Sequence, residues 1–230
     1  MIGEVFRILF PDKCLLCGRV LGRGELDLCG ECRTATPEFA ASSRKIHHCS
    51  AMTAVWYYDG AVRESILGYK FRGRRSRAGG YGRMLAMRVL RDLPAPDVIV
   101  GVPISAARLR QRGYDQVELV AKAAGRELAV PYVRALEKHR DNQANSSLES
   151  AAERRKNVRD VYRVVKPEAV AGRRVLLVDD VITTGATMSE CARMLREAGA
   201  ADVICAAIAA GKDKNTDSFA ENALQNHLSR

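Results

Sequence analysis

The chain has 230 residues, of which 47% are hydrophobic and 28% are charged, and its formal net charge at pH 7 is +10. This length and composition indicate a soluble globular protein with one core and room for a small appendage. A membrane span is excluded, because no apolar run is long enough to cross a bilayer, and a signal peptide is not expected at the N-terminus. We therefore expect a cytoplasmic protein with reduced cysteines and, given its basic charge, polyanionic partners such as phosphates or nucleic acid.

Two cysteine pairs lie near the N-terminus. Cys14 and Cys17 form one C-x-x-C pair, and Cys29 and Cys32 form a second pair eleven residues later. Each pair can place two thiolates on one tight turn, so the spacing predicts a tetrahedral structural Zn2+ site. The alternatives are four free thiols or a redox dithiol, and the latter is disfavoured because no β-α-β pattern surrounds either pair.

The segments on either side of the cysteine pairs carry weaker patterns. Residues 1–13 indicate a short amphipathic helix that serves as a docking element. Residues 33–50 are expected to be a linker with little order of its own. Within it, His47, His48 and Cys49 suggest a second metal site, but three adjacent residues cannot complete a tetrahedron, so we favour a buried Cys49 without metal.

A strand, a helix and a basic run come next. Thr53–Tyr58 is rich in β-forming residues, and Asp59 can cap the helix that follows. That helix leads into Lys70–Arg77, in which five of eight residues are positively charged. The run is either a solvated face or a contact for nucleic acid or phosphate. The nucleic-acid candidates are Lys70, Arg72, Arg74, Arg75 and Arg77.

The middle of the chain predicts further strands and helices. Gly79, Gly80 and Gly82 are expected to interrupt the chain before a helix that contains Leu85 and Val89. Asp97–Pro103 predicts an apolar strand with a Gly/Pro turn, and the basic stretch Arg108–Gln116 is expected to open another helix.

Residues 137–158 form a long polar segment between the predicted strands Val130–Leu136 and Val161–Val165. Long polar segments in compact domains are often functional lids. We predict a mobile lid that closes over a ligand, with a surface loop as the alternative. Val203–Ala209 predicts the last strand, and the residues after Gly211 form a polar tail.

Val175–Thr187 is the most informative stretch of the chain. Val175–Val178 predicts a strand buried on both faces, Asp179 and Asp180 follow it, and Thr183–Thr187 leads into a helical pattern. Ligands of open α/β sheets bind beyond the C-terminal strand ends, and helix N-termini favour anions. Ionised carboxylates only accept hydrogen bonds, so they favour hydroxyl donors or a metal. The stretch predicts a site for a ribose 5-phosphate; a buried strand with a capped turn is the alternative.

This last motif resembles the 5-phosphoribosyl-1-diphosphate (PRPP) binding motif of type I phosphoribosyltransferases. In chain order, the wider set of motifs is similar to the ComF family over residues of about 10 to 210. That set comprises the cysteine pairs, Tyr-Tyr-Asp-Gly-x-x-Arg, Lys-Phe-Arg-Gly, Val-Pro-Ile-x-x-x-Arg-x-x-x-Arg-Gly-Tyr-Asp-Gln, Glu153–Asn157 and Asp-Asp-Val-Ile-Thr-Thr-Gly-Ala-Thr. Two departures are Asp115, where family members usually have Asn, and Cys49, where many carry a second cysteine pair.

The resemblance implies roles for individual residues. The ribose would contact Asp179 and Asp180, and the 5-phosphate would contact Thr183, Thr184, Gly185, Ala186 and Thr187. The pyrophosphate loop would include Val102, Pro103, Arg108 and Arg112, and the lid would include Arg140, Gln143 and Arg155. Mg2+ would accompany PRPP and neutralise the diphosphate.

The resemblance also implies an α/β fold. We expect a twisted, mostly parallel type I phosphoribosyltransferase-like sheet with helices on both faces, plus a small four-cysteine zinc ribbon. The expected divisions are residues 1–50 for the N-terminal helix, ribbon and linker, 51–211 for the phosphoribosyltransferase-like domain, and 212–230 for the tail.

Two functions remain open at this point. One is a PRPP-binding protein linked to DNA uptake in natural transformation that transfers a phosphoribosyl group and releases pyrophosphate. The other is a non-catalytic competence factor that binds single-stranded DNA on the same fold. Other DNA-uptake proteins are expected partners of both. Glutamine amidotransferase activity is not expected, because Cys14 and Cys17 are assigned to zinc.

Overall fold

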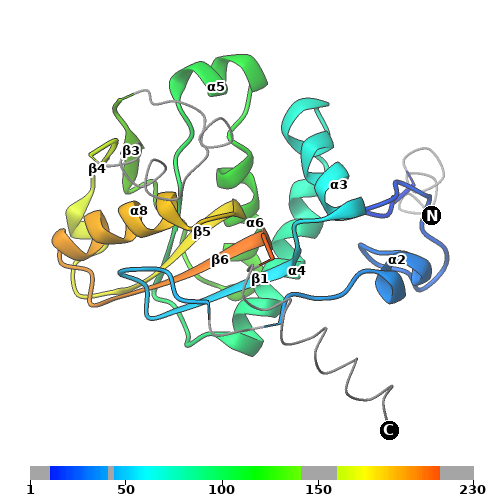
Figure 1. Ribbon diagram of the computed structural model, residues 1–230, viewed down its shortest axis with the longest axis horizontal. Coiled ribbons are helices and arrows are strands. Elements are labelled where there is room, and N and C mark those ends of the chain that lie inside the picture. The colour runs from blue at the N-terminus through cyan, green and yellow to red at the C-terminus, as the bar shows by residue number, and fades with distance from the viewer. Residues whose placement is uncertain (1–10, 41–43, 141–159, 213–230) are drawn as a thin grey trace, which may run out of the picture.

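A four-stranded parallel sheet forms the centre of the protein (Figure 1). The computed structural model describes residues 11–40, 44–140 and 160–212. In sheet order, the strands are β1 (Ala51–Tyr57), β6 (Asp202–Ala210), β5 (Arg174–Ile182) and β2 (Val98–Gly101). All four were predicted, and their continuous apolar runs are typical of strands covered on both faces. The predicted α/β class is confirmed.

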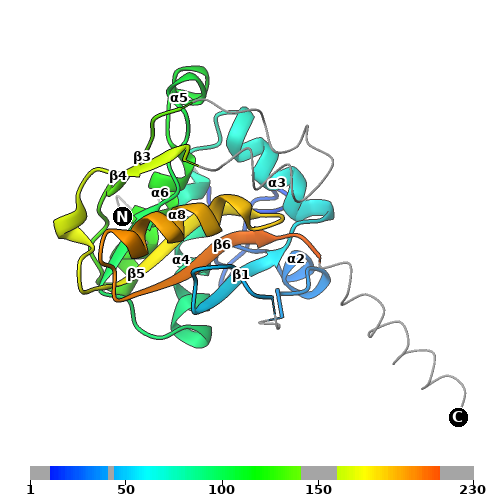
Figure 2. The same cartoon turned by 60° about the vertical axis from the view of Figure 1, so that its left-hand side comes forward.

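Helices cover both faces of this sheet (Figure 2). One face carries α3 (Gly60–Phe71), α4 (Arg77–Asp92) and α6 (Gln116–Leu128), and the other carries α8 (Ala186–Glu197). A small antiparallel pair, β3 (Leu136–Lys138) with β4 (Tyr162–Val164), lies on the α8 side, followed by the 3-10 helix η2 (Pro167–Ala169). Alternate residues of β5 therefore enter different cores: Leu176 and Val178 face the first, and Val175 and Leu177 face the second.

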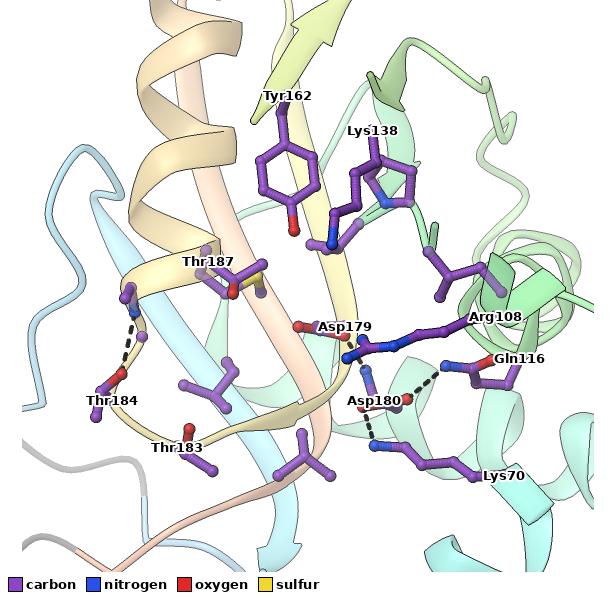
Figure 3. A pocket seen from close by; sticks show the side chains of 18 of the residues that line it. Lys70, Arg108, Gln116, Lys138, Tyr162, Asp179, Asp180, Thr183, Thr184 and Thr187 are labelled. Atoms are coloured by element: carbon purple, nitrogen blue, oxygen red, sulfur yellow. Dashed lines mark hydrogen bonds and ion pairs between the residues drawn. The ribbon is translucent and has the colours of Figure 1, made fainter. Parts of the chain in front are cut away.

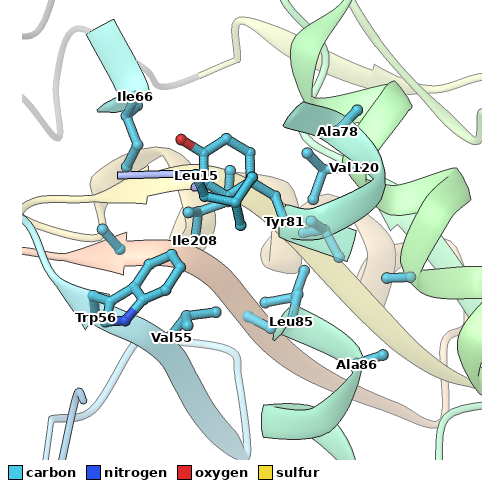
Figure 4. Packing of buried hydrophobic residues seen from close by; sticks show 14 of the residues in the cluster. Leu15, Val55, Trp56, Ile66, Ala78, Tyr81, Leu85, Ala86, Val120 and Ile208 are labelled. Atoms are coloured by element: carbon cyan, nitrogen blue, oxygen red, sulfur yellow. The ribbon is translucent and has the colours of Figure 1, made fainter. Parts of the chain in front are cut away.

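The cysteine-bearing segment packs into the first of these cores (Figure 4). Leu15 is buried beside Tyr81 of α4, and the Ser65 hydroxyl of α3 donates a hydrogen bond to the Leu15 carbonyl. Asp27 receives two hydrogen bonds from Arg83 of α4, at 3.0 and 2.5 Å. This segment is thus joined to the sheet domain by apolar packing and by a bidentate ion pair.

The segment after the cysteines is more ordered than we predicted. It begins with α2 (Gly30–Ala35), and the Phe39 N–H then donates to Val55 O of β1 at 3.0 Å. The buried Arg88 side chain donates to Phe39 O at 2.5 Å. The prediction of a linker with little order is wrong for the part that the structure describes, because these residues cover the edge of β1. Cys49 is half-buried rather than buried.

The three glycines predicted to interrupt the chain lie inside α4 instead. A Cβ on Gly82 would lie 2.3 Å from the Ala123 Cβ, and a Cβ on Gly80 would lie 2.7 Å from Asp27 Oδ1. These positions are glycine because α6 and the cysteine-bearing segment approach the α4 backbone closely. Sequence alone shows the glycines but not the neighbours that require them.

Other boundaries also differ from the predictions. The helix predicted from Arg108 is two helices, because α5 (Ala106–Arg112) ends at Gly113, whose φ is +71°, and α6 starts at the Asp115 cap. Most of Val130–Leu136 is extended chain outside a named strand, with one bridge between Ile99 and Tyr132. The predicted N-terminal helix up to residue 10, the lid segment 141–159 and the tail from residue 213 lie outside the described residues. Within the described ranges, no helix has both the length and the apolar character that a membrane span needs.

The close contact between α4 and α6 gives a testable prediction. Gly82→Ala should lower the free energy of unfolding by about 1–3 kcal/mol, because the new methyl group overlaps Ala123. Gly79→Ala is the matched control in the same helix, since only the end of the Arg83 side chain lies near, at 3.8 Å. It should stabilise the protein by up to about 1 kcal/mol through helix propensity. Urea unfolding of both variants measures the difference, and equal effects would contradict the packing argument.

Candidate functional site

The C-terminal ends of the parallel strands border a pocket of about 350 Å³ (Figure 3). It collects residues from β5, from the start of α8, from the loop after β2 and from α5. The predicted ribose, 5-phosphate and pyrophosphate-loop residues that line it are Asp179, Asp180, Thr183, Thr184, Gly185, Ala186, Thr187, Val102, Pro103, Arg108 and Arg112. Residues separated by up to 85 positions in the chain are therefore brought to one site.

Asp179 and Asp180 lie within β5 rather than after it. The strand continues to Ile182 because β6 pairs with it as far as Ala210. Successive side chains of a strand point to opposite faces, so the two carboxylates reach the pocket from different sides. Burial, reinforced by the charge of Asp180, raises the pKa of Asp179 well above its usual range.

Asp180 is held by two side chains from other elements. Lys70 Nζ of α3 lies 2.8 Å from Asp180 Oδ1, and Gln116 Nε2 of α6 donates to Oδ2 at 2.9 Å. The backbone of Gln116 is itself fixed, because its main-chain carbonyl accepts a hydrogen bond from the Tyr69 hydroxyl at 2.8 Å. Gln116 Oε1 is buried and has no hydrogen-bond partner among the residues that the structure describes. It is an acceptor available to a hydroxyl group in the pocket.

The loop from Thr183 to Thr187 forms the anion-favouring end of the pocket. Gly185 has φ +78° and directly precedes α8, so the N-cap residue itself has no side chain, and the nearest side-chain contact is that of the Ala186 N–H, which donates to Thr184 Oγ1 at 3.5 Å. The left-handed backbone angle favours Gly here, and a Cβ at this position would also have to displace the end of the Ile46 side chain, 2.4 Å away. Amides at a helix N-terminus favour a phosphate, and the threonine hydroxyls add further donors.

Basic side chains form the opposite side of the pocket. Arg108 reaches from α5 toward the carboxylates, and Lys138 and Tyr162 point into the pocket from β3 and β4 (Figure 3). Lys138 and Tyr162 are direct partners in the β3–β4 pairing, which fixes one relative to the other. The Arg112 guanidinium stacks on Phe71, 4.8 Å from the ring centroid, and burial lowers its pKa. This side can balance several negative charges.

Four of these side chains were not predicted for this site: Lys70, Gln116, Lys138 and Tyr162. Lys70 was assigned to the nucleic-acid run, and Gln116 ends a quoted motif without a role. Lys138 lies at the start of the predicted polar segment 137–158, and Tyr162 lies in the strand predicted after it; nothing in their local sequence distinguishes them from their neighbours. Among the lid candidates, Arg140 is exposed, whereas Gln143 and Arg155 lie outside the described residues.

The charged residues of the basic run Lys70–Arg77 fall into two groups, paired and exposed. Lys70 pairs with Asp180, and the buried Arg77 donates to the Ser65 carbonyl at 3.1 Å, so neither presents its charge to solvent as the nucleic-acid assignment requires. Arg72, Arg74 and Arg75 are exposed. These three side chains of the run therefore face solvent.

The four cysteines of the N-terminal pairs converge on one point. The sulfur atoms of Cys14, Cys17, Cys29 and Cys32 all lie within 4.8 Å of one another. Burial alone would raise the pKa of Cys14, but N–H groups of the neighbouring backbone outweigh it and lower the pKa to about 6. Cys29 Sγ accepts a hydrogen bond from Cys32 N. Thiolates gathered in this way can hold a metal ion. Within the described residues, His47, His48 and Cys49 form no such group.

The fold is that of a type I phosphoribosyltransferase-like protein. Residues 82–223 match the family described as Phosphoribosyl transferase domain. DNA utilization protein YhgH from Escherichia coli (strain K12) is 29% identical over 216 residues, 84% of this chain and 94% of that protein. Competence protein ComFC from Streptococcus pneumoniae is 28% identical over 222 residues, 83% of this chain and 96% of that protein.

Two further matches are partial. Competence protein F from Haemophilus influenzae is 34% identical over 113 residues, 49% of each chain. The solved glutamine PRPP amidotransferase from B. subtilis has 28% identity and a TM-score of 0.42, over 60% of this chain and only 30% of that one. The chain belongs to the phosphoribosyl transferase domain family, and its resemblance to the ComF family is confirmed.

The cysteine cluster predicts one bound metal ion per reduced chain. Cys29→Ser should abolish binding and lower the melting temperature, because the metal holds a segment that packs into the first core. Cys49→Ser is the matched control and should keep the metal. Elemental analysis and thermal unfolding with and without a chelator measure both effects. A metal-free reduced wild-type protein would contradict the assignment.

Proposed function

We propose that this protein binds PRPP or a related phosphoribosyl ligand in the pocket at the end of β5. The observation that carries the proposal is the arrangement of two carboxylates, a helix N-terminus and several cations around one pocket. A ribose with a phosphate at each end needs acceptors in the middle and positive charge on both sides. Few other small ligands require all three.

Each part of the ligand has a counterpart in the pocket. Asp179 and Asp180 accept from the ribose hydroxyls, and the Thr183–Thr187 loop donates to the 5-phosphate. The diphosphate lies toward the Val102–Pro103 loop and Arg108. Transfer of the phosphoribosyl group would form a bond from C1 to a nitrogen nucleophile and break the C1–oxygen bond to the diphosphate, which leaves as pyrophosphate.

Two metal ions are part of the proposal, one at the cysteine cluster and one with PRPP. The four-cysteine cluster is proposed to hold zinc, since four sulfur ligands in a tetrahedron suit that ion. Mg2+ would be held by the phosphates of PRPP together with Asp179, where it neutralises charge on the diphosphate. The proposed divisions are residues 1–50, 51–211 and 212–230, and the protein is proposed to act in the cytoplasm.

The ribose assignment is tested by calorimetric titration of PRPP. Replacing Asp179→Asn together with Asp180→Asn should weaken binding at least about tenfold, because two carboxyl acceptors for the ribose hydroxyls are lost, including the Asp180 carboxylate paired with Lys70. Asp97→Asn is the control, since this exposed aspartate accepts from Arg174 N at the opposite end of β5. Unchanged affinity in the double variant, with its fold retained, would show that the ribose lies elsewhere.

The second candidate function is binding of single-stranded DNA. It is supported by the exposed Arg72, Arg74 and Arg75, by the net charge of +10, and by relatives named for DNA utilization and competence. On this proposal the protein acts with other DNA-uptake proteins. The two functions are compatible, because the exposed arginines lie outside the ribose pocket.

The DNA proposal predicts a steep dependence of affinity on salt. Neutralising Arg72, Arg74 and Arg75 to Gln should reduce the slope of log K against log salt by about 2, because three phosphate contacts are removed. The charge-matched control replaces Lys122, Arg126 and Arg173, which are exposed elsewhere, with Gln. Fluorescence anisotropy with labelled oligonucleotides measures the slopes. A flat response in the wild type would exclude this function.

A further inference from the structure

Phe71 is a large apolar side chain that the fold leaves in solvent. It is the last residue of α3, and 59% of it is exposed. Among the described residues, it is the only aromatic one in the set of exposed large hydrophobic side chains. Single apolar side chains on a surface are common, so the neighbours of this ring decide whether it marks a contact with another molecule.

Two contacts bring α5 against the end of α3. The Arg112 guanidinium of α5 lies over the Phe71 ring, 4.8 Å from its centroid, and Arg75 Nη2 donates to Gly113 O at 3.3 Å. Arg112 thus holds the ring from one side. Because more than half of the side chain is exposed, the ring keeps room for a second planar group. An aromatic ring held in this way loses little conformational freedom when it binds.

The elements beside Phe71 supply positive charge and no negative charge. Residues 65–91 and 98–114, which include the second half of α3, the basic run and all of α5, contain no Asp or Glu. Exposed arginines come from the chain after α3 and from α5: Arg72, Arg74, Arg75, Arg108 and Arg110. This surface is therefore complementary to a polyanion.

An exposed ring among arginines matches a single-stranded nucleic acid better than other polyanions. Phosphate groups alone need cations but no aromatic ring. The bases of a duplex are already stacked on one another, whereas an unpaired base has a face free for an aromatic side chain. Every base has such a face, so this contact requires no particular sequence, and the arginines can bind the phosphates on either side.

We propose that Phe71 is a stacking platform for an unpaired base of a single-stranded nucleic acid, and that the exposed arginines beside it bind the flanking phosphates. The proposal rests on the DNA-binding candidate function, to which it adds a base contact and a second element, α5. Arg112 also lines the ribose pocket, so the stacked base lies beside that pocket. Phe71 supplies the part of the affinity that does not depend on salt, and the arginines supply the part that does.

The experiment measures binding of the full-length protein by fluorescence anisotropy to labelled oligo-dT, to an abasic strand of the same length and to a duplex. Phe71→Ala should weaken binding of oligo-dT about fivefold or more, because stacking of one base is lost. Its affinity for the abasic strand and for the duplex should stay within about twofold of the wild type. The slope of log K against log salt should not change, since no charge is removed.

Matched variants separate the ring from its surroundings. Phe71→Tyr keeps an aromatic ring and should bind oligo-dT within about twofold of the wild type. Leu90→Ala removes an apolar side chain of α4 that is even more exposed, at 72%, and should change no affinity. Arg110→Gln should reduce the salt slope by about 0.7 on both single strands, because one phosphate contact is lost.

The outcomes distinguish this proposal from the one on which it rests. Absence of wild-type binding to both single strands would remove the DNA-binding function itself. An unchanged affinity of Phe71→Ala for oligo-dT, or an equal loss on the abasic strand, would overturn the stacking role and leave DNA binding in place. Thermal unfolding confirms that each variant is folded.

Discussion

The buried carboxylate of Asp180 is the constraint on which the rest of the site depends. Leaving such a group unpaired costs several kcal/mol, so the elements around it must deliver partners. Helix α3 supplies Lys70 and α6 supplies Gln116. Two tyrosines join these helices, because the Tyr114 hydroxyl donates to Tyr69 O and the Tyr69 hydroxyl donates to Gln116 O. The contacts that pack α3 against the turn before α6 therefore also position Lys70 and Gln116 at Asp180.

Much of this architecture could be predicted because its causes are local. Asp59 and Asp115 each precede a helix and accept from its first N–H groups, which a capping residue does from its own sequence neighbours. The apolar strands were likewise evident from runs of Val, Ile, Leu and Ala. The substitution of Asp115 for the family's usual Asn is accommodated for the same reason, since either side chain offers an oxygen to the Val117 and Glu118 amides.

The errors have causes that are distant in the chain. Gly82 looks like a helix breaker until Ala123, about forty residues later, is seen against its backbone. The local sequence of a charged run also does not reveal its partners: Lys70 pairs with Asp180, which lies far along the chain. Strand β5 extends beyond its apolar residues because β6 continues to pair with it. In each case a tertiary partner overrides the local pattern.

The basic run also connects the two candidate functions in space. Its first residue, Lys70, contacts the ribose carboxylate, and its last, Arg77, hydrogen-bonds to Ser65, which in turn donates to Leu15 O in the cysteine-bearing segment. Arg75 stacks on Tyr114 at 4.6 Å, beside the turn that carries Gln116. The exposed arginines therefore lie between the ribose pocket and the cysteine cluster. The backbone around these arginines is therefore positioned by contacts to both the pocket elements and the cysteine-bearing segment.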